Sequence, residues 1–315
     1  MTTQKTIAVV GATGAQGGAL VRAIMADPER AFAVRAITRK PDSPQAQALA
    51  AAGAEVVTGD SDHGETMKAA FDGADAAFCV TNYWEHFSPE REIAQARALA
   101  EAAKSAGVAH TVWSTLEDTR RWVPLDDARM PTLMGKYKVP HFDTKGESDA
   151  FFRELGVPVT FMLTSFYWEN FIYFGLGPKP DPDGVLALTF PLDDAKLPGI
   201  AVEDIGKCAY ALFKRREEFL GQTVGIAGEH LTGTEMAAAF TRALGRETRF
   251  NNVPPDVYRG FGFPGADDLG NMFQFKRDFN AYFCGARDLG VGRGLNPEMQ
   301  TLDAWLEKYK AKISV

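Results

Sequence analysis

Short apolar runs alternate with alanine-rich amphipathic stretches along the first half of the chain. The stretches near 15–26, 44–52, 64–72, 88–106 and 145–155 have helical character. The apolar runs are rich in β-branched residues, lack polar alternation, and lie at 6–12, 33–38, 54–59, 76–81, 110–115 and 159–164. Wholly apolar strands separated by helices indicate a parallel sheet covered on both faces. The pattern therefore predicts a doubly wound α/β fold of the Rossmann type.

The alternation weakens after residue 165, where we expect a smaller C-terminal α/β region. Its aromatic segment FYWENF is followed by the turn-forming PKPDPDG, and later by a helix that begins at Thr232 with capping-box spacing to Glu235. The stretch 254–310 is expected to be helical. We therefore predict one domain over 1–165 and a smaller region over 166–315, packed on the carboxyl edge of the sheet, with some segments interleaved.

The connection at 116–140 is too long and irregular for a tight turn. Long connections in compact domains are often lids or binding loops. A disordered surface excursion is the alternative interpretation, and both stay open from the sequence.

The bulk properties exclude several classes of protein. A length of 315 residues suits a nucleotide-binding domain with a smaller second region. The net charge of −7 argues against nucleic acid as a partner. The three cysteines and five histidines show no metal-ligand spacing, so no metal is expected. No apolar stretch approaches the roughly 18 residues of a membrane span, and we expect no signal peptide ahead of the first strand. We expect a cytoplasmic protein in a reducing environment.

A glycine-rich loop joins the first predicted strand to the first predicted helix. The segment VVGATGAQGG places Gly11, Gly14 and Gly17 there with GxxGxxG spacing. Such glycines permit a tight turn, close approach of backbone N–H groups to a pyrophosphate, and close packing of helix on strand. The loop predicts a bound dinucleotide.

The tip of the second strand selects between phosphorylated and unphosphorylated cofactors. NAD-binding proteins carry an acidic residue there, whereas this chain has Arg39 and Lys40 after Thr38. A guanidinium can pair with a 2′-phosphate, so NADP(H) is favoured. A solvated charge pair, blunted by Asp42, is the alternative. Other predicted strand ends on the same groove contribute Asp60, Ser61, Thr81, Asn82 and Tyr83.

Several motifs together resemble the NmrA-like family, an atypical branch of the short-chain dehydrogenases and reductases, and especially its members described as NADPH sensors. They are GATGAQGG, ITRKP, VTNYWE, HFDTKGE, FYWENF, FPGADDLGNMF and NPEMQTLDAWLE, in that order over almost the full length.

The resemblance implies a set of cofactor contacts. Arg39 would bind the 2′-phosphate and Lys145 the nicotinamide ribose. The further basic residue of the sensors is not evident after Arg39, where Asp42 and Ser43 stand. The phosphates would contact Thr13, Gly14, Ala15, Gln16 and Gly17, and the nicotinamide end Tyr167, Trp168, Glu169 and Asn170.

The usual acid of short-chain reductases is missing. These enzymes place a tyrosine four residues before the lysine, and this chain has His141 before Lys145, with Ser114 in the place of the substrate-positioning hydroxyl. His141 is either a substitute proton donor, although burial and a nearby lysine disfavour an imidazolium, or a helix-start histidine bonded to the backbone.

Two functions follow. The first is a cofactor-responsive, redox-sensing regulator that changes its self-association, for example as a homodimer, or its binding of a protein partner. The alternative is an NADPH-dependent reductase of an apolar aromatic electrophile such as a quinone, imine or azo compound. The aromatic segments would fill a core or line an apolar pocket.

Overall fold

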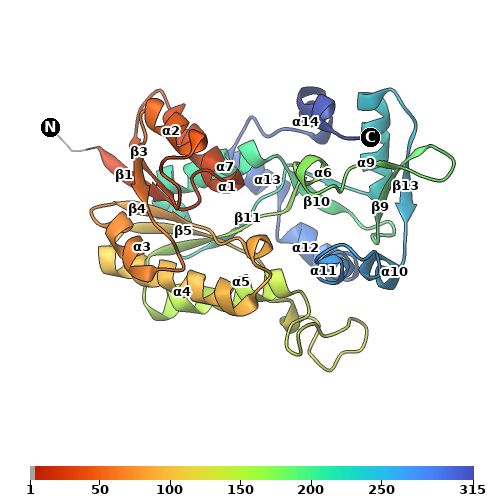
Figure 1. Cartoon of the computed structure of the whole chain (residues 1–315), viewed down its shortest axis with the longest axis horizontal. Helices are drawn as coiled ribbons and strands as arrows, with labels where there is room; N and C mark the ends of the chain where they lie inside the picture. The colour runs from red at the N-terminus through yellow and green to blue at the C-terminus, as the bar shows by residue number, and fades with distance from the viewer. Residues whose placement is uncertain (1–3) are drawn as a thin grey trace. The chain divides into compact units, whose positions relative to one another are not determined.

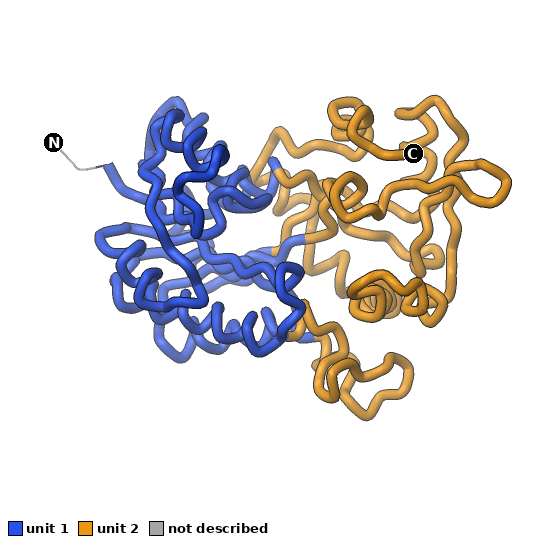
Figure 2. The backbone as a smooth tube through the Cα atoms, viewed as in Figure 1, with its two compact units in different colours: residues 1–118, 144–164, 203–224 blue, residues 119–143, 165–202, 225–315 orange. Residues whose placement is uncertain are grey.

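The computed structural model describes residues 4–315, and the chain divides into two compact units (Figure 2). Unit 1 contains the residues up to 118 together with 144–164 and 203–224, and unit 2 contains 119–143, 165–202 and 225–315. The units therefore interleave along the chain. The division into two domains at residue 165 stays a prediction, because compactness does not show that the regions fold separately.

Unit 1 is built on a seven-stranded sheet in the order β11-β6-β5-β4-β1-β2-β3 (Figure 1). The neighbouring pairs among β1 to β6 are parallel. This arrangement confirms the predicted Rossmann-type fold. The strands are β1 (Lys5–Val9), β2 (Phe32–Thr38), β3 (Glu55–Thr58), β4 (Ala76–Cys79), β5 (His110–Thr115), β6 (Val159–Leu163) and β11 (Thr223–Gly225).

Several helices of unit 1 begin and end at residues that cap helices well. Ser43 and Ser88 each accept a hydrogen bond from a first-turn N–H group, and a proline follows each of them. Gly107 ends the longest helix in the left-handed conformation. The helices are α1 (Ala15–Met25), α2 (Pro44–Ala51), α3 (Gly64–Phe71), α4 (Pro89–Ala106), α5 (Pro140–Glu154), α7 (Val202–Lys214) and α8 (Arg216–Phe219), with a short 3₁₀ helix η1 (Tyr83–Glu85).

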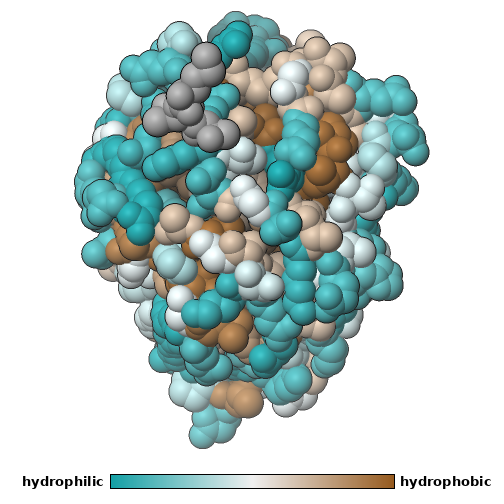
Figure 3. Space-filling view, turned by 90° about the vertical axis from the view of Figure 1, so that its left-hand side faces the viewer, coloured by the Kyte–Doolittle hydropathy of each residue, from teal (hydrophilic) through white to brown (hydrophobic). Residues whose placement is uncertain are grey.

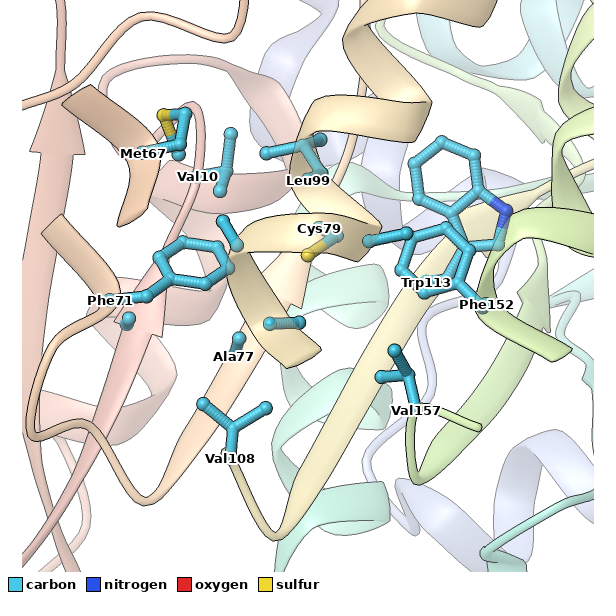
Figure 4. Close-up of a cluster of buried hydrophobic side chains, with 14 of the residues drawn as sticks. Val10, Met67, Phe71, Ala77, Cys79, Leu99, Val108, Trp113, Phe152 and Val157 are labelled. Atoms are coloured by element: carbon cyan, nitrogen blue, oxygen red, sulfur yellow. The ribbon is translucent and has the colours of Figure 1, made fainter. Parts of the chain in front are cut away.

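A large apolar cluster joins β1, β4 and β5 to the helices on one face of the sheet (Figure 4). Phe71 and Leu99 contribute from α3 and α4, and Trp113 of β5 stacks on Phe152 of α5 with ring centroids 5.0 Å apart. The burial of these rings and aliphatic chains stabilises the sheet, since each large side chain removed from water contributes about 1.5–3 kcal/mol.

The segment 203–224 returns to the first helix of unit 1. A Cβ added to Gly206 of α7 would lie 2.3 Å from the backbone carbonyl carbon of Ala19 in α1. One turn later, the Tyr210 hydroxyl donates a hydrogen bond of 2.6 Å to the Asp27 carboxylate. The two helices therefore pack backbone to backbone, and α7 belongs to the same fold as the first strand.

Unit 2 contains two three-stranded sheets, in the orders β12-β10-β7 and β13-β9-β8, with helices around them. Its α9 begins with the predicted capping box of Thr232 and Glu235. The strands are β7 (Phe166–Tyr167), β8 (Lys179–Pro180), β9 (Leu186–Phe190), β10 (Leu197–Ile200), β12 (Glu229–Leu231) and β13 (Thr248–Asn252). The helices are α6 (Asn170–Tyr173), α9 (Gly233–Leu244), α10 (Pro255–Arg259), α11 (Ala266–Asp278), α12 (Asn280–Gly285), α13 (Leu289–Leu295) and α14 (Leu302–Tyr309), with 3₁₀ helices η2 (Thr119–Arg121) and η3 (Lys310–Lys312).

The irregular segment 119–143 is fixed to α11 within unit 2. The Asn271 side-chain amide donates to the carbonyl oxygens of Pro131 (2.9 Å) and Lys138 (2.6 Å). Gln274 donates to the carbonyl oxygen of Arg129 at 2.7 Å. The segment is thus an ordered, hydrogen-bonded part of unit 2. The alternative interpretation of this connection as a disordered surface excursion does not fit these contacts.

The buried carboxylate of Asp143 accepts hydrogen bonds from both ends of the same segment. Asp143 accepts hydrogen bonds from the N–H and hydroxyl of Thr119 through Oδ1, and from the N–H groups of Lys138 and Val139 through Oδ2. Burial raises the pKa of Asp143 to about 6, although these four hydrogen bonds oppose the shift. The Asp143 carboxylate therefore joins the two ends of the segment 119–143 by hydrogen bonds.

The aromatic segments of the second half form core structure in unit 2. Phe166, Phe171 and Phe273 are buried, and the rings of Phe166 and Phe273 lie 6.3 Å apart. Tyr173 and Phe174 are exposed instead. Of the two roles expected for the aromatic segments, these three rings have that of core filling.

The surface is mixed in character. On the face shown in Figure 3, hydrophilic residues predominate and hydrophobic residues show in several separate areas. No helix within residues 4–315 is long and apolar enough to cross a bilayer.

Candidate functional site

The predicted cofactor residues of unit 1 gather at one edge of its sheet. Because β3, β2, β1 and β4 are parallel neighbours, their carboxyl ends share that edge. Gly11, Arg39, Asp60 and Thr81 each follow one of these strands within a few residues. Strands β1 and β4 are adjacent at the point where the strand order reverses, which is where ligands bind in open α/β sheets.

The loop between β1 and α1 has the geometry of an anion cradle. Gly11 has φ of +64°, and a Cβ on Gly17 would lie 2.4 Å from the Gly11 carbonyl oxygen. The N-cap residue Gly14 provides no side-chain hydrogen bond, and the first turn of α1 carries no acidic residue. Thr13, Gly14 and Ala15 are exposed. The N-terminal backbone of α1 is thus open to a negatively charged group, as pyrophosphate binding requires.

The arginine at the tip of β2 already has an acidic partner. Arg39 forms an ion pair of 2.6 Å with Glu85 of η1, and both side chains are more than two-fifths exposed. The hydrogen bond that Arg39 donates to Glu85 raises the pKa of Arg39, and the charges of Asp60 and Asp62 act in the same direction. Lys40 is exposed, and its N–H donates to the Thr38 hydroxyl. A phosphate on Arg39 would therefore compete with a carboxylate.

The loops after β3 and β4 are ordered by contacts inside unit 1. The N–H of Asp60 donates to the Thr66 hydroxyl at 2.9 Å, and Ser61 is half-buried beside it. After β4, Asn82 is exposed, whereas Tyr83 is buried against neighbouring rings. These loops bring polar groups to the same edge as the glycine loop.

Lys145 of α5 reaches the end of β4. Its Nζ donates to the carbonyl oxygen of Thr81 (3.0 Å) and to the Thr81 hydroxyl (2.6 Å), and forms an ion pair with Glu92 at 2.8 Å. It also lies 5.4 Å from the centre of the Trp113 ring. Lys145 is buried, so its ammonium is surrounded by these partners rather than by solvent.

Glu92 of α4 is a site residue that the sequence interpretation missed. It is fully buried, and its other oxygen lies 3.4 Å from His86 Nε2. Burial opposes its ionisation, but the charge of Lys145 and hydrogen bonds from His86, Lys145 and Thr81 lower its pKa to about 2. Its spacing to Ala96 and Leu99 places Glu92 on the buried stripe of α4. An acidic residue on the buried side of an amphipathic helix is the sequence signal that could have identified it.

Ser114 lies in β5, buried and paired with Met162 of β6. Its neighbours Trp113 and Thr115 both donate hydrogen bonds to Asp149 of α5. Since side chains alternate along a strand, Ser114 faces the other side of the sheet from that pair.

His141 lies in the first turn of α5, in the part of the chain that belongs to unit 2. Its Nδ1 is 2.6 Å from Asp268 Oδ1, and its N–H donates to Asp268 Oδ2 at 3.2 Å. Both side chains are buried. The His141 ring is therefore bonded to a carboxylate of α11. Sequence reasoning missed Asp268, since the two residues are 127 positions apart.

The residues 167–170 lie in unit 2 and take part in its packing. Trp168 is buried, and the carboxylate of Glu169 accepts hydrogen bonds from Val202 N–H and the Trp305 indole. Tyr167 pairs with Ile200 in the sheet. Asn170 begins α6.

Comparisons with known proteins agree with the fold. The model of the NmrA-like family matches residues 3–307. The NmrA-like family domain-containing oxidoreductase FrzB of Cladobotryum sp. is 31% identical over 85% of this chain and 83% of its own length, and the oxidoreductase notA' of Aspergillus versicolor is 35% identical over 99% of both.

The crystal structure of NmrA, a negative transcriptional regulator, superposes with a TM-score of 0.80 at 25% identity, covering 97% of this chain and 95% of NmrA. NmrA has also been solved in complex with NAD and with NADP. Family model, sequence relatives and structure all lead to one assignment. The protein belongs to the NmrA-like family.

Proposed function

We propose that this protein binds NADP(H) at the carboxyl edge of the unit 1 sheet. The observation that carries the proposal is the β1–α1 loop, where Gly17 leaves no room for a side chain and the N-terminus of α1 has no side-chain cap or acidic residue. The pyrophosphate lies on Thr13–Gly17, and a dinucleotide extends from there along the ends of β2 and β4. NADP-bound NmrA supports this placement.

Arg39 is the residue that favours the phosphorylated cofactor. It stands at the end of β2, where NAD-binding proteins carry an acid, and its guanidinium is exposed enough to receive a 2′-phosphate. Lys145, at the end of β4, holds the nicotinamide ribose.

We further propose that the protein uses the cofactor as a signal, as a redox-sensing regulator. No tyrosine stands four residues before Lys145, and Lys145 is tied to Glu92 and Thr81 rather than to a proton-donating hydroxyl of α5. The name of NmrA, a negative transcriptional regulator, supports a regulatory role. A regulator requires different affinity for the cofactor in two conformations or association states.

The test begins with titration calorimetry of NADPH, NADP⁺, NADH and NAD⁺ against the purified protein. We expect measurable binding of the phosphorylated forms and weaker binding of the others. Light scattering with and without saturating NADPH should then show a change in self-association, or a pull-down should show a change in partner binding. Equal affinity for all four cofactors would contradict NADP(H) selection.

A second function, an NADPH-dependent reductase of an apolar aromatic electrophile, has its own observation. Asp268 fixes the His141 ring through Nδ1, which orients the imidazole as acid–base residues are oriented in enzymes. FrzB and notA' carry oxidoreductase names. A bound cofactor would supply the hydride in such a reaction, and His141 would supply or relay the proton.

The two functions separate in one assay. NADPH oxidation is followed at 340 nm with a panel of quinones, imines and azo compounds. Turnover that falls strongly in His141→Ala, with NADPH affinity unchanged, supports the reductase. A background rate with every acceptor, together with cofactor-dependent association, supports the regulator.

A further inference from the structure

All three N–H groups of the Lys145 ammonium are engaged inside unit 1. An ammonium has three donors, and here they reach the Thr81 carbonyl (3.0 Å), the Thr81 hydroxyl (2.6 Å) and Glu92 Oε1 (2.8 Å). The longest of these contacts is the one to the Thr81 carbonyl at the end of β4. A cofactor hydroxyl can bind Lys145 only by taking the place of one of them.

Glu92 is the charge that holds this arrangement together. It is fully buried, and a buried charge is stable only with a close partner. The Thr81 hydroxyl donates to Glu92 Oε1 at 2.6 Å while accepting from Lys145, so the three side chains form a closed ring. Behind Glu92, His86 Nδ1 accepts from the Ser88 N–H, which leaves the proton on Nε2, facing Glu92.

We propose that Glu92 is the positioning residue for the cofactor lysine, an inference that rests on the proposed NADP(H) binding. Glu92 holds the Lys145 ammonium at the end of β4. When NADP(H) binds, a hydroxyl of the nicotinamide ribose replaces the Thr81 carbonyl as an acceptor, and the bond to Glu92 is kept. The affinity for the nicotinamide half of the cofactor therefore depends on an acid that does not touch it.

The test compares NADPH with adenosine 2′,5′-bisphosphate, which carries the adenine side and the 2′-phosphate but no nicotinamide ribose. In Glu92→Gln, the NADPH affinity should fall about tenfold to a hundredfold, the worth of one hydrogen bond from a charged donor. The affinity for the bisphosphate should stay within about twofold, because it depends on Arg39 rather than on Lys145. The control is Glu90→Gln, an exposed acid on the same helix, which should change neither affinity.

A double-mutant cycle completes the test. Lys145→Met should show the same selective loss, and Glu92→Gln combined with Lys145→Met should lose no more than Lys145→Met alone. If Glu92→Gln does not fold, Glu92→Asp keeps the charge but retracts the carboxylate, and it should show a smaller loss with the same selectivity.

The outcomes separate the inference from the proposed function. Equal loss of NADPH and bisphosphate affinity, or no loss of either, or additive effects in the cycle, would overturn the role of Glu92. If the wild-type protein binds neither compound, the proposed NADP(H) binding itself fails.

Discussion

Replacing Gly17 with alanine tests whether the close approach in the β1–α1 loop is required. The added Cβ would lie 2.4 Å from the Gly11 carbonyl oxygen, 2.6 Å from its carbon and 2.7 Å from the Val10 oxygen. All three are backbone atoms, so the clash cannot be relieved by a side-chain rotation, and the loop or the start of α1 must move. Such overpacking costs about 1–3 kcal/mol.

Two measurements should respond together. The melting temperature should fall by roughly 2–4 °C for each kcal/mol lost. The NADPH affinity should fall at least about tenfold, since displacing one N–H group from a phosphate forfeits a hydrogen bond to a charged acceptor, worth about 1.5–3 kcal/mol. Differential scanning calorimetry and titration calorimetry give the two values.

Gly18→Ala is the matched control. Its added Cβ would lie 3.2 Å from the Ala12 oxygen and 3.3 Å from the end of the Arg22 side chain, which can move away. Alanine is also about 1 kcal/mol more favourable than glycine inside a helix, so the variant should melt close to wild type and bind NADPH normally. A Gly17→Ala protein that behaves like this control would refute the packing argument.

Three further predictions concern the ion pairs and the helix contacts. Glu85→Gln frees Arg39 from a competing carboxylate; because exposed pairs are worth about 0.2–1 kcal/mol, NADP⁺ affinity should rise by roughly 1.4-fold to fivefold with NAD⁺ affinity unchanged, as calorimetry would show. Asp143→Asn loses acceptors for two of four donors. The pKa of Asp143 is raised from 3.8 to about 6, so the stabilisation from its protonation is complete below pH 4 and is lost as the pH rises through 6. Urea unfolding should show the variant more destabilised at pH 4.5 than at pH 7, by about 2 kcal/mol, and a pH-independent difference would contradict this. Gly146→Ala puts a Cβ 2.3 Å from the Asp118 nitrogen and should lower the free energy of unfolding by about 1–3 kcal/mol in denaturant titrations.

The parallel sheet and the glycine loop could be predicted because each is a local property of the chain. A fully buried strand is recognised from its own mostly apolar run, as in β4 or β6. The glycine-rich junction between strand and helix occupies ten consecutive residues, 9–18. The capping box at Thr232 is local in the same way. In each case the pattern that predicts the structure lies within a short stretch of consecutive residues.

The partners of the predicted side chains could not be found in this way. Lys145 meets Thr81 across 64 positions, and His141 meets Asp268 across 127. Such pairs depend on which strand ends and helices the fold brings together, and no spacing in the sequence encodes them. Glu92 was the nearest to detectable, as an acid on the buried stripe of α4.

The packing of α7 on α1 has a consequence for dissecting the protein. With Gly206 packed against the backbone at Ala19 and Tyr210 bonded to Asp27, unit 1 depends on a segment encoded beyond residue 200. A truncated polypeptide that stops at residue 164 would leave the apolar flank of α1 bare and should aggregate or unfold. Researchers who wish to express this half alone must graft the 203–224 stretch back onto it through a short linker.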